Sequence, residues 1–428
     1  MPSTPVAPSQ SLRILAVNPV YLPCVGGAER LLQAILENLV HRGHDATVLT
    51  LDARTVTDLF DPGGSGLPAE ERIGGVRIRR VCPTGGAVGS TVRRTCRFLV
   101  RRRLGGVVPG GWAHELAARP SPAGMLRWLR REDYDVVVCS NWWSPVTPAC
   151  AAVASRRGLP VVALPLLHVE QQWSRRPILG RALPDCAASV ALTPSEVPYH
   201  RALGARAVEV IGCGIASDWG QRADGAGLRR RLGLGDQPVV GFVGRQDEGK
   251  GVPRLIQAMR TVWAQRPSAV LLLAGMASHR DEPTKRALAA LTPEERGRVA
   301  EVSDFGSDEA PSVFAACDVL AQPSVEESFG IVLTEAWMVG RPVIGASIPA
   351  TRDLVSDGAD GLIVPPADPE ALAAAIIRLI DSPADRARMG EHGRAKVLER
   401  YTVSSMVDRW ESLLRSVARR GAPGSSGG

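Results

Sequence analysis

The chain has 428 residues, of which 45% are hydrophobic and 22% are charged, with a formal net charge of +7. This length exceeds what one hydrophobic core usually supports, so we expect two domains. No apolar run reaches the roughly 18 residues of a membrane span, which argues against an integral membrane protein. The eight cysteines form neither a C-x-x-C motif nor a Cys/His pairing at zinc spacing, so we expect buried, reduced thiols and no metal site.

Both ends of the chain have the composition of flexible tails. The segment 1–11, MPSTPVAPSQS, lacks the basic and apolar regions of a signal peptide, and the segment 421–428 is GAPGSSGG. We therefore expect disordered tails at 1–11 and 421–428. Because cysteines without an export signal stay reduced, we also expect a cytoplasmic protein.

Arginine is concentrated in RRTCRFLVRRRL, residues 93–104. A solvated arginine-rich face is one interpretation, and contact with an anionic substrate is another. A third is peripheral contact, through Arg93 to Arg103, with anionic lipid at the inner membrane face. Nucleic-acid binding is not expected, since the stretch has a single aromatic residue and no recognisable module surrounds it.

The N-terminal half opens with a β-loop-α-β pattern. A short apolar strand over 13–18 leads to a loop that ends in Gly26 and Gly27, and a helical periodicity over 28–43 is followed by a strand over 45–51. Further strands are expected at 134–140, 159–167 and 188–193. This order indicates a parallel sheet with helices on its faces.

The same scheme begins again in the C-terminal half. A strand is expected over 238–244 and a helix over 252–265, with further strands at 269–275, 317–324 and 341–347. We therefore predict an α/β protein with two doubly wound domains joined near 206–237. Ligands of such sheets bind beyond the carboxyl ends of the strands. The loops 19–27, 245–251 and 324–330 follow strands and are expected to face one another across a cleft.

The segment GRQDEGKG, residues 244–251, nearly fits the phosphate-binding pattern G-x-x-x-x-G-K-[ST]. Gly244, Gly249 and Lys250 match, but Gly251 replaces the hydroxyl residue that would hold magnesium. This predicts phosphate binding without a metal, in which the glycines and a helix N-terminus receive the anion and Arg245 and Lys250 supply charge. The alternative is an ordinary strand-turn-helix with surface cations.

The segment PSVEESFGIVLTEAWMVG, residues 323–340, sets Glu327 and Glu335 around Phe329-Gly330. Only Thr334 and Glu335 interrupt an apolar run from Phe329 to Val339, so we expect this run to be buried and Glu335 to have a partner. Free N–H groups after Gly330 can face an anion. Glu335 would then accept hydrogen bonds from a ribose and Glu327 from another sugar, which suits a sugar nucleotide. The alternative is that Glu335 meets a buried arginine.

These two motifs resemble those of the retaining nucleotide-sugar glycosyltransferases of family 4, which have the GT-B fold. One family motif has two glutamates separated by seven residues, and it matches Pro323-Ser324, Glu327, Phe329-Gly330 and Glu335-Ala336. The second motif, G-R-x-x-x-x-K-G, matches residues 244–251. GGAER at 26–30 is also typical, and the similarity extends from about residue 12 to residue 418.

The resemblance implies a role for each matching position. Arg245 and Lys250 would neutralise the nucleotide diphosphate, and Glu327 would hold the transferred sugar. The remaining donor-binding positions are Gly26, Gly27, Phe329, Gly330 and Glu335, the last of these for the ribose. His168 matches the family's active-site histidine, although a lone histidine ending a strand is more often structural. The catalytic set is thus His168, Glu327, Arg245 and Lys250.

The resemblance also implies a domain plan and an activity. An N-terminal acceptor domain would span 12–205, a donor domain 206–400, and a C-terminal helix over 401–420 would pack back on the N-terminal domain. The expected activity is retaining transfer of a hexose-type sugar from a UDP- or GDP-sugar to a hydroxyl, in glycoconjugate, polysaccharide or antibiotic biosynthesis, without a metal or other cofactor. The alternatives are a non-hydrolysing nucleotide-sugar epimerase and a nucleotide-binding protein without chemistry.

Two segments depart from the family pattern. GCGIAS at 212–217 replaces the usual P-N-G-V-D, and IPATRD at 348–353 places Asp353 where Glu is usual. Neither departure removes a predicted phosphate ligand.

Overall fold

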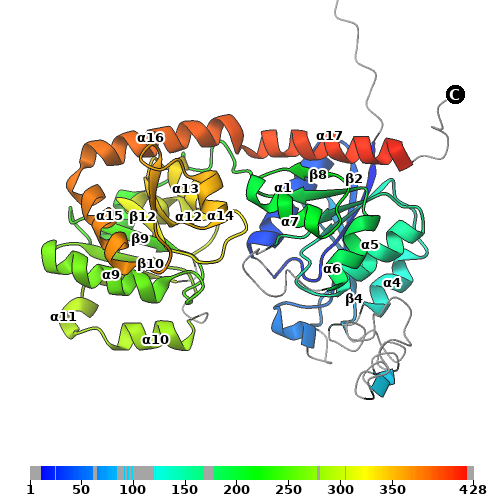
Figure 1. Cartoon of the computed structure of the whole chain (residues 1–428), viewed down its shortest axis with the longest axis horizontal. Helices are drawn as coiled ribbons and strands as arrows, with labels where there is room; N and C mark the ends of the chain where they lie inside the picture. The colour runs from blue at the N-terminus through cyan, green and yellow to red at the C-terminus, as the bar shows by residue number, and fades with distance from the viewer. Residues whose placement is uncertain are drawn as a thin grey trace, which may run out of the picture. The chain divides into compact units, whose positions relative to one another are not determined.

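The structure, a computed structural model, describes residues 11–24, 26–60, 65–83, 91, 94–95, 98–99, 102, 120, 122–167, 177–276, 280–303 and 305–421 (Figure 1). Apart from residues 11 and 421, the predicted tails lie outside the described residues. So do His168 and most of the arginine-rich stretch with its predicted membrane contact. The chain forms two compact units: unit 1 comprises Met1–Ile211 and Met406–Gly428, and unit 2 comprises Gly212–Ser405.

Unit 1 is built on an eight-stranded sheet of order β3-β4-β2-β1-β5-β6-β7-β8. Its strands are β1 (Arg13–Val17), β2 (Asp45–Leu51), β3 (Glu70–Ile73), β4 (Val76–Val81), β5 (Val136–Ser140), β6 (Val161–Leu164), β7 (Ala188–Ala191) and β8 (Val208–Val210). Only β3 runs antiparallel to its neighbour, β4. The central strands carry almost uninterrupted apolar residues, as expected for parallel strands buried on both faces.

The helices of unit 1 cover both faces of this sheet. They are α1 (Gly27–His41), α4 (Ala123–Leu129), α5 (Val146–Arg156), α6 (Pro177–Ala182) and α7 (Val197–Ala202), with 3-10 turns at Thr57–Phe60, Leu183–Asp185 and Pro194–Glu196. Leu15 and Val17 of β1 belong to a core with residues of α4, α5 and α6. Because side chains alternate along a strand, Ile14 and Ala16 point to the opposite face.

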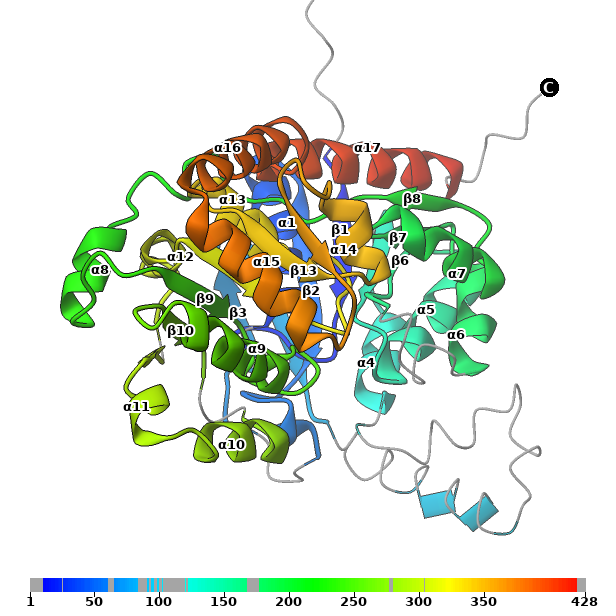
Figure 2. The ribbon, with the colours of Figure 1, turned by 60° about the vertical axis from the view of Figure 1, so that its left-hand side comes forward.

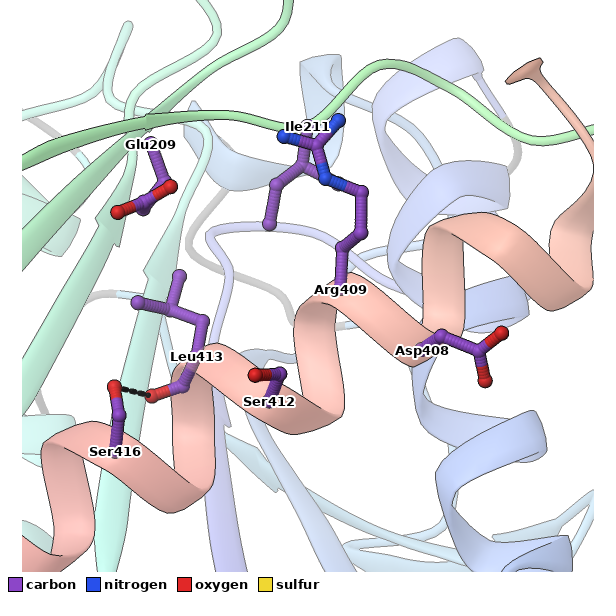
Figure 3. Close-up of a pocket in the computed structure, with 7 residues that line it drawn as sticks. All are labelled: Glu209, Ile211, Asp408, Arg409, Ser412, Leu413 and Ser416. Atoms are coloured by element: carbon purple, nitrogen blue, oxygen red, sulfur yellow. Dashed lines mark hydrogen bonds between the residues drawn. The ribbon is translucent and has the colours of Figure 1, made fainter.

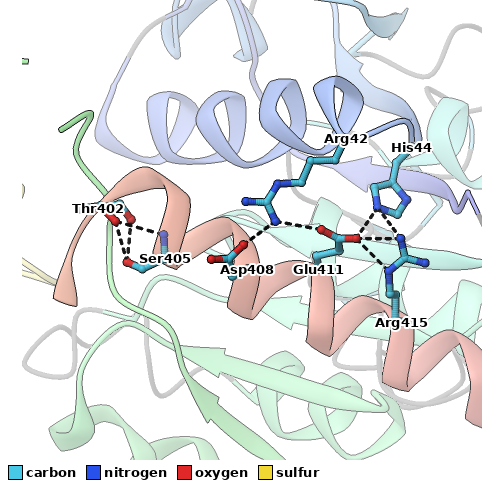
Figure 4. A network of polar contacts seen from close by, with 7 residues as sticks. All are labelled: Arg42, His44, Thr402, Ser405, Asp408, Glu411 and Arg415. Carbon is cyan, nitrogen blue, oxygen red and sulfur yellow. Dashed lines mark hydrogen bonds and ion pairs between the residues drawn. The ribbon is translucent and has the colours of Figure 1, made fainter. Parts of the chain in front are cut away.

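The last helix, α17 (Val403–Gly421), forms ion pairs with residues that follow α1 in unit 1 (Figure 4). Arg42, just after α1, lies 2.7 Å from Asp408 and 2.9 Å from Glu411. His44 accepts the Leu12 N–H at Nδ1, so its Nε2, 3.3 Å from Glu411, carries the proton. Burial raises the pKa of Glu411, but hydrogen bonds from Arg42, Arg415 and His44 outweigh it and lower that pKa to about 2.

Unit 2 is built on a six-stranded, all-parallel sheet of order β11-β10-β9-β12-β13-β14. Its strands are β9 (Val239–Val243), β10 (Val270–Ala274), β11 (Val299–Val302), β12 (Val319–Gln322), β13 (Val343–Ala346) and β14 (Gly361–Val364). The chain therefore forms two parallel-sheet α/β domains, as the sequence predicts.

The helices of unit 2 are α8 (Gly225–Arg231), α9 (Val252–Gln265), α10 (Glu282–Ala289), α11 (Pro293–Arg296), α12 (Ala310–Ala316), α13 (Ile331–Met338), α14 (Pro349–Leu354), α15 (Pro369–Asp381) and α16 (Pro383–Arg400). On one face of the sheet α9 and α15 pack against each other and share one hydrophobic core (Figure 2).

The segment 206–237, which was predicted to join the domains, is largely part of them. β8 completes the first sheet, and α8 packs against α12 in unit 2. The compact units divide after Ile211 and after Ser405. The helix was missed because GAGLRRR has no apolar stripe; its start is set by Asp224, whose carboxylate accepts the Gly227 N–H at 2.7 Å.

No helix within the described ranges is long and apolar enough to cross a membrane. All cysteines in these ranges are free thiols, and most of them are buried, as predicted.

Candidate active site

The two C-terminal motifs follow the two strands at the topological switch point of the unit 2 sheet. β9 and β12 are neighbours there, with β10 and β11 on one side and β13 and β14 on the other. The loop 244–251 follows β9 and the loop 323–330 follows β12. Ligands of open α/β sheets bind at this point, so the fold brings the two predicted donor loops to the place where a ligand is expected.

The loop 244–251 is held against the loop after β12 by backbone contacts. Gly251 has a φ of +85°, and a Cβ on it would lie 2.3 Å from the carbonyl oxygen of Pro323. Val325 N–H donates to the carbonyl of Gly249 at 3.0 Å. Gly251, which replaces the hydroxyl residue of the phosphate-loop pattern, is thus required for the close approach of the two loops.

Lys250 and Glu327, predicted as diphosphate and sugar ligands, are brought together in an ion pair. Lys250 Nζ lies 2.8 Å from Glu327 Oε1, and the two side chains are only 17% and 12% exposed. Lys250 Nζ is also 3.4 Å from the carbonyl oxygen of Glu326. The lysine charge is therefore balanced by the carboxylate that the motif supplies for the sugar.

Arg245 is in a different situation. Its side chain is 59% exposed, and its guanidinium is 3.4 Å from Asp247 Oδ2. Asp247 also accepts the backbone N–H of Lys250 at 2.8 Å. The Arg245 side chain is thus far more exposed than that of Lys250, although its partner Asp247 is only 17% exposed.

Helix α13 begins directly after Gly330, which has a φ of +88°. The segment 329–339 was expected to be buried throughout, but Val339 at its end is half-buried, and so are Ile331, Val332 and Glu335. These three residues are spaced i, i+1 and i+4, so they form one stripe of the helix. A carboxylate beside two partly exposed apolar side chains suits an amphipathic ligand such as a nucleoside.

Phe329, predicted to bind the donor, is only 4% exposed. Its ring lies edge-to-face against Tyr401, with centroids 5.6 Å apart. Its contacts are therefore internal to unit 2.

In unit 1, Gly26 and Gly27 begin α1, as the predicted diphosphate-binding amides require. Glu29 of the same GGAER motif is 6% exposed, and its carboxylate lies beside Gly26, where a Cβ would be 2.7 Å from Oε2. Asn141, in a left-handed conformation after β5, donates to Glu29 Oε1 at 3.2 Å. Burial raises the pKa of Glu29, while hydrogen bonds from backbone N–H groups and Asn141 oppose this.

The sequence analysis did not predict that the Glu29 carboxylate would be buried beside Gly26 at the start of α1. The available signal was an acidic residue three positions after the N-cap glycine, the spacing at which a side chain reaches back to the first amides of a helix.

One cavity, of about 340 Å³, lies elsewhere in unit 1, between β8 and α17 (Figure 3). Glu209, Asp408 and Arg409 are among its lining residues, together with Ile211, Ser412, Leu413 and Ser416. None of the predicted site residues lines it. Across the described part of the chain, no three His, Cys, Asp or Glu side chains are grouped as a metal site requires.

Comparison with known proteins agrees with this arrangement. Residues 25–219 match the family described as Glycosyltransferase Family 4, and residues 227–396 match the family described as Glycosyl transferases group 1. The two matches together span most of the chain.

Two curated relatives show similarity over part of the chain. An alpha-D-kanosaminyltransferase of Streptomyces kanamyceticus is 30% identical over 47% of this chain and 53% of its own length. A GDP-mannose-dependent monoacylated alpha-(1-6)-phosphatidylinositol monomannoside mannosyltransferase of Corynebacterium glutamicum is 34% identical over 46% of this chain and 52% of its own. The chain thus spans about half the length of these relatives.

A solved structure of Anabaena HepE in complex with UDP and glucose has the same fold. Its TM-score is 0.71 at 21% identity, covering 95% of this chain and 100% of that one. Fold and family matches together define a GT-B glycosyltransferase. The chain is family 4-like among these enzymes.

Proposed function

We propose that this protein transfers a hexose-type sugar, with retention of anomeric configuration, from a UDP- or GDP-sugar to a hydroxyl acceptor. The observation that carries the proposal is the docking of the two donor loops at the β9/β12 switch point. In this docking a cation, Lys250, lies 2.8 Å from the carboxylate of Glu327, the residue predicted to bind the sugar. A diphosphate joined to a sugar needs these two groups side by side.

Charge stabilisation is the main chemical contribution proposed for unit 2. Departure of the nucleoside diphosphate adds negative charge to the phosphate oxygen that leaves the sugar C1. Lys250, Arg245 and the N-termini of α9 and α13 would bind this charge better in the transition state than in the ground state. A unit charge pair at about 4 Å is worth roughly 4 kcal/mol at an effective dielectric of 20. Each cation is therefore expected to change the rate by orders of magnitude.

Retention is proposed to follow from attack on the same face of the sugar. The C1–phosphate oxygen bond breaks, the acceptor oxygen bonds to C1, and the acceptor proton passes to the departing phosphate oxygen. Glu327 would hold sugar hydroxyls, Glu335 the ribose, and His168 would lie near the transferred sugar. No metal ion takes part in this scheme.

The acceptor is proposed to be a small molecule, lipid or polysaccharide hydroxyl. The names of the kanosaminyltransferase and the phosphatidylinositol monomannoside mannosyltransferase support antibiotic and glycolipid pathways respectively. The matched families and these relatives are glycosyltransferases and give no support to the epimerase alternative.

A donor screen followed by an acceptor screen tests the proposal. Purified protein is incubated with UDP- and GDP-sugars and a panel of hydroxyl acceptors, and products are detected by mass spectrometry. NMR of the new anomeric centre then establishes its configuration. Product with the donor's anomeric configuration is expected. An inverted product, or donor turnover to an isomeric sugar nucleotide without acceptor, would contradict the proposal.

A further inference from the structure

Phe329, in the predicted donor loop, is packed against two segments that are far from it in sequence. Its ring and that of Tyr401 meet edge-to-face, with centroids 5.6 Å apart and planes at 69°. A Cβ on Gly212 would lie 2.8 Å from a ring carbon of Phe329 and 3.2 Å from one of Tyr401. The absence of a side chain at residue 212 therefore allows both rings to close over this backbone.

These segments adjoin the two places where the chain passes between the units, after Ile211 and after Ser405. Within unit 2 they are bonded to each other. Ile215 N–H donates to the Tyr401 carbonyl at 2.8 Å, and Val403 N–H donates to the Ile215 carbonyl at 2.9 Å. Residues 212–215 and 401–403 thus form two backbone segments joined by hydrogen bonds, and the Phe329 ring packs against this pair of segments.

We propose that Tyr401 is a positioning residue for donor binding, acting through its ring contact with Phe329. Phe329 directly precedes the Gly330 turn that opens α13, so fixing its ring fixes Glu327 before the turn and Glu335 after it. This inference rests on the proposed function, since Glu327 and Glu335 are its donor ligands. Coupling between sites is reciprocal, so an occupied donor site should in turn protect the paired segments 212–215 and 401–403.

A second aromatic pair in unit 2 provides a matched control. Trp219 and Phe314 are also edge-to-face, with centroids 5.6 Å apart and planes at 65°. Neither residue lies in a donor loop, and Trp219, like Tyr401, is half-buried. Trp219→Leu therefore removes a comparable contact from the same unit and reports what loss of an aromatic pair does to stability alone.

The experiment compares wild-type protein with Tyr401→Leu, Tyr401→Phe and Trp219→Leu. UDP and GDP are titrated by calorimetry, and hydrogen exchange of 212–215 and 401–403 is measured with and without the nucleotide that binds. Because Glu335 is the ligand proposed for the ribose of the free nucleotide, its misplacement in Tyr401→Leu is expected to weaken binding about tenfold, equivalent to ~1.4 kcal/mol, and to remove the nucleotide-dependent protection. Tyr401→Phe keeps the ring and should keep both. Trp219→Leu should melt lower yet bind normally.

Wild-type affinity and protection in Tyr401→Leu would overturn the proposal. So would an equal loss of affinity in Trp219→Leu, or a loss in Tyr401→Phe as large as in Tyr401→Leu. A wild-type protein that binds neither UDP nor GDP would instead contradict the proposed function itself. The two failures are therefore distinguishable in one data set.

Discussion

Replacing Glu327 by Gln is expected to tighten the binding of a free nucleoside diphosphate. From the motif alone, Glu327 would matter only for the sugar and its loss would spare the free nucleotide. The structure changes this expectation, because Glu327 Oε1 lies 2.8 Å from Lys250 Nζ. A diphosphate approaching Lys250 must either displace this carboxylate or accept its repulsion.

The size of the effect follows from the geometry of the pair. At 2.8 Å the gross attraction is about 6 kcal/mol for an effective dielectric of 20. Desolvation offsets most of this, and a hydrogen bond between charged groups retains a net value of roughly 1.5–3 kcal/mol. Freeing Lys250 should therefore lower the Kd of UDP or GDP by about tenfold. The sugar nucleotide should gain less, since it loses hydrogen bonds from its hydroxyls to Glu327.

Calorimetric titration with UDP and GDP measures the change in Kd, and kcat/KM for the sugar nucleotide shows how the substitution affects transfer. Glu248→Gln is the matched control, since it removes one negative charge from an exposed side chain two positions before Lys250. It should change the Kd less than twofold. In a Lys250→Ala background the effect of Glu327→Gln should disappear. Unchanged or weaker nucleotide binding in Glu327→Gln would refute the reasoning.

Four further outcomes are expected. Lys250→Ala and Arg245→Ala should each lower kcat/KM at least about 100-fold while circular dichroism shows an intact fold; near-normal turnover in both would contradict the assignment. Transfer should survive EDTA, and loss on chelation with recovery on adding Mg²⁺ or Mn²⁺ would count against a metal-free mechanism. Glu335→Gln should weaken free nucleotide binding about tenfold by weakening a charge-assisted hydrogen bond; a lower melting temperature with unchanged affinity would make the residue structural. The pKa of Glu411 is about 2, below its ordinary 4.5, so its stabilisation is complete above pH 4.5 and is lost as pH falls toward 2. Unfolding of wild type and Glu411→Gln across that range should show a difference that shrinks with falling pH.

Much of the fold was predictable because its central elements have strong local patterns. The helix expected over 252–265 is α9 with the same bounds. The buried parallel strands appear as apolar runs, and each expected strand is present within a few residues. Five strands were missed, namely β3, β4, β8, β11 and β14. In β4, Arg77 and Arg79 interrupt the apolar pattern, as suits the part of a sheet near its edge with one face toward solvent.

The places of the two predicted donor motifs in the fold were predictable, but their side-chain contacts were not. The motifs placed Lys250 and Glu327 in loops after two strands, and the switch-point topology brings those loops together. Spacing cannot show that the two side chains pair, since that depends on the exact approach of Gly251 to Pro323. The same limit applies to Phe329, whose motif position suggests a ligand contact while its ring lies against Tyr401.

The two units share one feature that local patterns do not reveal. In unit 2 the carboxylate of Glu327 lies beside Lys250, the predicted phosphate ligand, and in unit 1 the carboxylate of Glu29 lies beside Gly26 at the start of α1. Lys250 and Gly26, both predicted to receive the diphosphate, thus each lie beside a carboxylate, that of Glu327 from the second donor motif and that of Glu29 from the GGAER motif. A small anion must compete with these carboxylates and gains little, whereas a sugar nucleotide offers hydroxyls to the displaced carboxylate as well as phosphate to the cation. If the proposed function holds, this arrangement should favour the complete donor over free phosphate, and the specificity would arise from the paired side chains rather than from the charge of the loop.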